Sequence, residues 1–133
     1  MAYEATTRGI VVRVRPEYLP QQSDPDEGRW AWAYHVELVN LSAETVQLVA
    51  RHWIITDATG RVEQVQGLGV VGEQPTLRPG ESHAYTSGCP LPTPSGTMAG
   101  SYLMITDRGE QFQAEIPAFS LDLPHAPRTE PRP

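Results

Sequence analysis

The chain has 133 residues, which is enough for one domain with a single hydrophobic core but scarcely for two. Its 13 prolines and 11 glycines are too many for a bundle of long helices, so frequent turns are expected. With 16 acidic and 10 basic residues the net charge is −6, which disfavours binding to a nucleic-acid backbone.

The first third of the chain has two stretches with the periodicity of strands. In residues 9–14, Ile10, Val12 and Val14 recur at every second position, which predicts a strand with one buried face. Residues 15–29 are rich in proline and acidic residues and are expected to form a mobile loop. Residues 30–38 show the clearest alternation and predict a central strand, with one face formed by Trp30, Trp32, Tyr34, Val36 and Leu38.

The middle of the chain predicts a hairpin followed by a glycine-rich segment. Residues 46–56 favour a strand, residues 57–60 form a turn signature, and residues 61–66 return as the partner strand. The glycine-rich segment covers residues 67–72. A tight turn is expected near residues 77–81, and residues 82–87 can pair again.

The last third alternates weak and strong strand signals. Glycines and prolines in residues 88–100 allow only short or edge pairing, whereas residues 102–106 predict a strand before a turn at 107–110. The final apolar positions change parity after Ile116, so a bulge is expected near Pro117. Residues 1–124 are expected to form the domain, and residues 125–133 a disordered, proline-rich tail.

About seven short strands at a spacing of roughly ten residues, without helical periodicity, are typical of an all-β fold. The sequence therefore predicts an antiparallel β-sandwich of the immunoglobulin or fibronectin type III kind. A small closed barrel is the alternative.

Gly67, Gly69 and Gly72 have the spacing G-x-G-x-x-G of dinucleotide-binding loops. The usual context is missing, because no helical pattern follows Gly72 and no acidic residue lies about 20 residues further on. Two interpretations remain. The glycines either meet a backbone requirement, or their N–H groups form an anion nest to which Arg51 or His52 adds charge.

The segment from Arg51 to Trp53 also has two interpretations. Trp53 is either a core residue, with Arg51 pointing to solvent, or part of an exposed patch with Arg51 and Tyr85. Tryptophan, arginine and tyrosine dominate the hot spots of protein interfaces, so an exposed patch would bind a protein partner.

No pattern of catalytic or metal-binding residues stands out. The four histidines are scattered, and Cys89 is the only cysteine, so neither a zinc site nor a Cys–His nucleophile is expected. We therefore expect no enzyme activity and no cofactor. A single cysteine, no apolar run long enough to span a bilayer and no apolar leader predict a cytoplasmic protein without a membrane segment.

Several longer motifs in one order resemble the bacterial ApaG family over about residues 3–124. They include RHWIITD at 51–57, GLGVVGEQP at 67–75, PGE at 79–81, YTSGC at 85–89, TPSGTM at 93–98, GSY at 100–102 and IPAF at 116–119.

This resemblance implies a fibronectin type III-like sandwich that binds other proteins, as related domains do in some eukaryotic F-box and polymerase-interacting proteins. It implies no enzyme activity. The family's label as cobalt and magnesium efflux proteins implies at most an indirect link to metal resistance. We therefore expect a non-enzymatic module with an unidentified protein partner; the alternative is a phosphate-, pyrophosphate- or nucleotide-binding protein that uses residues 67–72.

Overall fold

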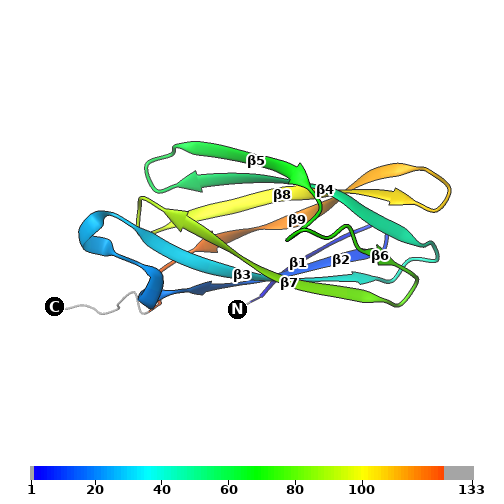
Figure 1. Ribbon diagram of the computed structural model, residues 1–133, viewed down its shortest axis with the longest axis horizontal. Coiled ribbons are helices and arrows are strands. Elements are labelled where there is room, and N and C mark those ends of the chain that lie inside the picture. The colour runs from blue at the N-terminus through cyan, green and yellow to red at the C-terminus, as the bar shows by residue number, and fades with distance from the viewer. Residues whose placement is uncertain (1, 125–133) are drawn as a thin grey trace.

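The computed structural model describes residues 2–124, so the tail predicted at 125–133 lies outside the described residues. Within this range nine strands form two antiparallel sheets that stack as two layers (Figure 1). No helix there is long and apolar enough to cross a membrane. The two sheets remain separate, which confirms the predicted sandwich over the closed barrel.

The first sheet has four strands in the order β1-β2-β3-β7. Their bounds are β1 Tyr3–Thr7, β2 Ile10–Tyr18, β3 Trp30–Asn40 and β7 Ser82–Leu91. The second sheet has the order β5-β4-β8-β9, with β6 paired to the start of β4. Its strands are β4 Val46–Asp57, β5 Val62–Leu68, β6 Thr76–Leu77, β8 Gly96–Thr106 and β9 Gln111–Leu121.

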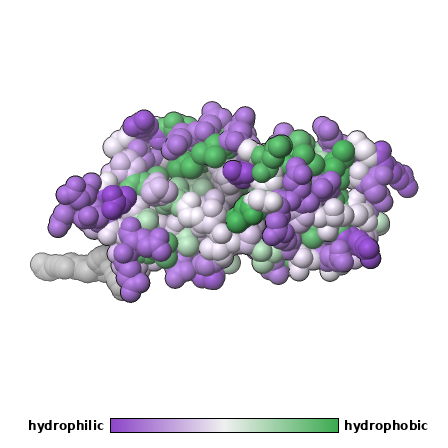
Figure 2. Space-filling model, viewed as in Figure 1, coloured by the Kyte–Doolittle hydropathy of each residue, from purple (hydrophilic) through white to green (hydrophobic). Residues whose placement is uncertain are grey.

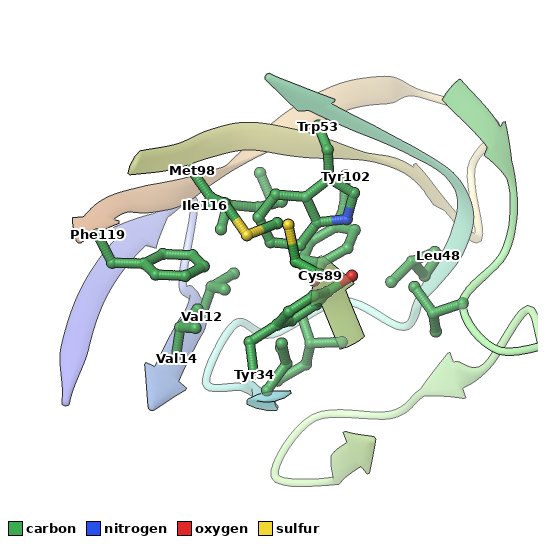
Figure 3. Close-up of a cluster of buried hydrophobic side chains, with 14 of the residues drawn as sticks. Val12, Val14, Tyr34, Leu48, Trp53, Cys89, Met98, Tyr102, Ile116 and Phe119 are labelled. Atoms are coloured by element: carbon green, nitrogen blue, oxygen red, sulfur yellow. The ribbon is translucent and has the colours of Figure 1, made fainter. Parts of the chain in front are cut away.

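The core lies between the sheets and is built by the predicted alternation. The even-numbered residues of β3 from Trp32 to Leu38 are all buried, and Trp53 of β4 faces them from the second sheet. The rings of Tyr34 and Trp53 are 5.0 Å apart between centroids, and Phe119 packs edge-on against Trp53 at 6.0 Å (Figure 3). Such tilted and edge-on pairs add to the stability gained from burial.

Two β-bulges set which residues of the second sheet face the core. In β9, Ile116 pairs with Gly100 and Phe119 pairs with Met98, so β9 has one extra residue at Pro117, as the parity change predicted. In β4, Val49 is the extra residue between Leu48 and Ala50. This second bulge was not expected, and it turns the odd-numbered residues after it toward the interior.

Three expectations from the sequence were wrong. The predicted loop 15–29 begins as strand, because β2 continues to Tyr18, and two short 3₁₀ turns, Pro20–Gln22 and Pro25–Glu27, follow. Residues 96–100 belong to β8, which pairs on both sides; Gly96 and Gly100 lie so close to the backbone of β4 that a Cβ atom at either would clash with a carbonyl oxygen there. The structure has nine strands where about seven were predicted, because β1 and β6 were not expected. The sequence of β1 is largely polar, and β6 has only two residues.

Candidate binding site

Arg51 lies beneath the glycine segment. Its Nη1 atom donates to the carbonyl oxygens of Leu68 and Gly69, both at 3.0 Å. A Cβ atom at Gly67 would come within 2.8 Å of the guanidinium, so the absence of a side chain there lets Arg51 pack against the strand. Trp53 is buried, as one of the two interpretations predicted, but Arg51 shares its strand face and bonds to backbone carbonyls, so the predicted orientation of Arg51 toward solvent was wrong.

The segment after β5 is a tight hairpin. Val70 and Glu73 donate their backbone N–H groups to each other's carbonyl at 2.8 and 3.0 Å, and Gly69 N–H donates to Val49 at 2.8 Å. Val71 and Gly72, at φ 46° and 79°, form the two-residue turn, which has the positive φ values of a type I′ turn. The N–H groups of Gly69 and Val70 are therefore already paired within the chain.

Of the other predicted site residues, Trp53 and Tyr85 do not join Arg51 in one exposed patch, whereas His52 and Gly67 line a surface hollow together with it. His52 lies on the opposite face of β4, where its Nε2 atom is 2.8 Å from Gln64 Oε1. Trp53 is 2% exposed, so burial of its ring removes it from the predicted surface patch. Tyr85 is half-buried, and its hydroxyl pairs with that of Tyr102 in the interior.

A cleft lies between the sheets where the edge strands β5 and β7 face each other; both run along the near side of the molecule in Figure 1. The opposite side is closed, because β9 packs against β1 and β2. We call this the inter-sheet cleft. Its volume is about 270 Å³, and the residues that line it are Tyr34, Arg51, Trp53, Ile55, Glu63, Val65, Ser87, Gly88, Cys89, Pro90 and Met98.

Cys89 has no features of a nucleophile. It is 5% exposed, and burial, assisted by the negative charge of Glu63, raises the pKa of its thiol to about 11. The thiol is therefore neutral at physiological pH, whereas a nucleophilic cysteine reacts as the thiolate. Within residues 2–124 no group of three or more histidine, cysteine or acidic side chains has the arrangement of a metal site.

A hollow of about 400 Å³ lies on the outer face of the second sheet. It is lined by Ala50, Arg51, His52, Gln66, Gly67, Leu68, Ser101, Leu103 and Gln113, and we call it the outer-face hollow. Leu68 at its rim is 75% exposed, and Val71 in the adjacent turn is 63% exposed. Figure 2 shows hydrophobic residues gathered near the end of β5 and the adjoining part of β4. No sequence pattern predicts this surface, because its residues come together only through the pairing of strands.

Comparison with known proteins gives one consistent result. Residues 20–106 match the model of a family described as the ApaG domain. A protein named Protein ApaG from Rhodospirillum centenum is 65% identical over 92% of this chain and 95% of its own length, and one from Brucella canis is 59% identical over 96% and 98%. The crystal structure of the putative ApaA protein from Bordetella pertussis, 49% identical, has a TM-score of 0.85 and covers 90% of this chain and 95% of that one.

Proposed function

Since the chain belongs to the ApaG domain family, we propose that it is a non-enzymatic module that binds another protein through the outer-face hollow and the adjacent turn. The observation that carries this proposal is the exposure of Leu68 and Val71, at 75% and 63%, beside the hollow. Large apolar side chains that gather on a surface are typical of sites that a partner covers.

The lining of the hollow suits a protein partner. Leu68 and Leu103 both pair with Ala50 across the sheet, so an apolar strip crosses three neighbouring strands. Polar side chains flank this strip, among them His52, paired with Gln64. An apolar centre with a polar border is the usual composition of a protein interface.

The phosphate- or nucleotide-binding alternative has less support. An anion nest needs free backbone N–H groups, and those of Gly69, Val70 and Glu73 are bonded within the chain. The free donors of Arg51 are also reduced by its two bonds to backbone carbonyls. We therefore assign the three glycines a structural role.

The remaining parts of the proposal concern the cellular compartment and a link to metal resistance. A single cysteine, buried as a thiol, suits a reducing cytoplasm. We propose that any role of this chain in cobalt or magnesium resistance is indirect and passes through its protein partner.

A pair of substitutions on one strand tests the protein-binding surface. Leu68→Asp places a charge at the rim of the hollow, whereas Val62→Asp places one on the same face of β5 at its other end, where Val62 is 54% exposed. Affinity capture from native lysate, quantified by mass spectrometry, should show proteins retained by the wild type and by Val62→Asp. The same proteins should be depleted at least ten-fold with Leu68→Asp, because a buried unpaired charge is costly.

Identical capture by both variants and the wild type would refute this surface. Circular dichroism of each variant confirms that the sandwich is intact. Equal loss in both variants would also contradict the proposal, since it would reflect net charge rather than a defined interface.

A further inference from the structure

The inter-sheet cleft contains a buried hydrogen-bond donor without an acceptor. Trp53 is 2% exposed, and within residues 2–124 its indole Nε1 is the one buried side-chain nitrogen or oxygen that lacks a partner. A buried N–H group left unpaired destabilises the folded state, and nearly all such groups in native proteins pair with protein, water or a ligand. The indole N–H of Trp53 therefore needs a hydrogen-bond acceptor, and the described residues supply none.

The ring of Trp53 lines the cleft, and the rings packed around it limit the directions in which its N–H group can point. Trp53 is held between Tyr34, Tyr102 and Phe119, with ring centroids at 5.0, 6.4 and 6.0 Å. In Figure 3 the indole nitrogen lies on the side of the ring away from Phe119. Phe119 belongs to β9 on the closed side of the sandwich, whereas the cleft opens along β5 and β7.

The rest of the lining defines the kind of molecule that fits. The ring of Tyr34 and the side chains of Val65 and Met98 supply apolar walls, and the cleft's volume of about 270 Å³ suits a molecule of one or two rings. Arg51 and Glu63 bring opposite charges to the same cleft, so their fields partly cancel and a neutral ligand is favoured over an ion.

We propose that the inter-sheet cleft binds a small, neutral aromatic molecule whose carbonyl oxygen, or an equivalent acceptor, pairs with the indole N–H of Trp53. The site is distinct from the outer-face hollow and does not depend on the proposed protein partner. Arg51 is the residue that lines both.

A matched pair of probes tests this proposal. Acetophenone has a ring and a carbonyl acceptor, and ethylbenzene has nearly the same shape without the acceptor. We expect acetophenone to shift the Trp53 indole cross-peak and the Val65 amide saturably in ¹H–¹⁵N NMR spectra. Ethylbenzene should bind about two- to ten-fold more weakly, which is the contribution of one hydrogen bond.

Three variants show where the probes bind. Trp53→Phe keeps an aromatic ring but removes the N–H group, so the affinity for acetophenone should fall to that for ethylbenzene. Val65→Trp fills the cleft from β5 and should abolish the shifts of both probes. Val62→Trp, three residues earlier on the outward face of the same strand, should leave both affinities unchanged.

Several results would overturn the proposal. Equal affinity for the two probes, or an indole cross-peak that acetophenone does not move, would exclude pairing with Trp53. Shifts that persist in Val65→Trp, or that centre on Leu68 and Leu103, would place the binding on the outer face. The absence of any saturable shift up to the solubility limit of acetophenone would remove the site altogether.

Discussion

At the scale of single residues, the glycines of the G-x-G-x-x-G segment have different structural roles. Gly69 combines a φ of +65° with a crowded position, because a Cβ atom there would lie 2.3 Å from the carbonyl oxygen of Glu73. Gly72 has a similar φ of +79°, but a Cβ atom there would meet nothing within 4 Å. Gly67 is extended and leaves room for the Arg51 guanidinium. The shared motif therefore hides three separate steric requirements.

This difference gives a prediction for alanine substitutions. Gly72→Ala should lower the free energy of unfolding by about 1 kcal/mol, the cost of a positive φ for a residue with a Cβ. Gly69→Ala should cost at least about 3 kcal/mol, because the backbone of Glu73 must also move. Urea unfolding followed by tryptophan fluorescence measures both. Equal losses would mean that Glu73 moves freely and that the turn is not packed as described.

At the scale of elements, one buried side chain ties three segments together. Asn40 ends β3 and is fully buried; its Nδ2 atom donates to the carbonyl oxygens of Glu44 at 2.7 Å and Leu77 at 2.9 Å. Its Oδ1 atom accepts from the backbone N–H of Ser42 at 2.9 Å. The asparagine thus joins β3, the β3–β4 turn and β6, a role that its turn-forming character did not reveal.

Removing this side chain should weaken all three connections. We predict that Asn40→Ala lowers the free energy of unfolding by about 2 to 4 kcal/mol, since one buried and one partly buried carbonyl lose their donor. The adjacent Leu41 is 66% exposed, so Leu41→Ala should change stability by less than about 0.5 kcal/mol. Chemical denaturation of the two variants provides the comparison. A loss below about 1 kcal/mol for Asn40→Ala would show that water replaces the amide.

The two bulges show how far element details could be read from the sequence. The parity of apolar residues changes between Ile116 and Phe119, so the bulge at Pro117 was predictable. Around Val49 apolar residues occupy both parities, so no alternation exists whose interruption could reveal the second bulge. The orientation of Arg51 depends on that second bulge. The hydrogen-bond partners of Arg51 are backbone carbonyls, which every residue has, so residue types do not predict them.

At the scale of the whole molecule, the fold class followed from local patterns, whereas the binding surfaces did not. The alternation in β3 and the hairpin turns predict a sandwich without knowledge of long-range pairing. The inter-sheet cleft requires β5 and β7, which are edge strands of different sheets, to face each other. That arrangement depends on topology, which residue spacing does not encode.

The interior also predicts sensitivity to alkaline pH. Burial raises the pKa values of Tyr34, Tyr85 and Tyr102, and that of Cys89 to about 11. The folded state therefore holds these protons at pH values above the ordinary pKa of 9.0 for cysteine and 10.0 for tyrosine, at which the unfolded chain releases them. Stability should be constant with respect to these groups up to about pH 8 and fall as the pH rises from about 9.

Urea unfolding at intervals between pH 7 and pH 10.5 measures this dependence. The chain contains no lysine, which removes the side chain that usually titrates in the same range. Tyr85→Phe should give a shallower decline above pH 9, because one raised pKa is lost. Stability that stays level to pH 10.5 would show that the tyrosines ionise within the folded protein.

The open edges of the sandwich have a consequence for behaviour at high concentration. A free edge strand is a template onto which a strand of another copy can add, and repeated addition leads to fibres. Glu63 places a carboxylate at the cleft on β5, and Pro90 interrupts the N–H groups of β7. A strand added at β5 would have to bury the carboxylate of Glu63, and a strand added at β7 would find no N–H donor at Pro90. The two borders of the cleft therefore resist the addition of further strands, and with it aggregation.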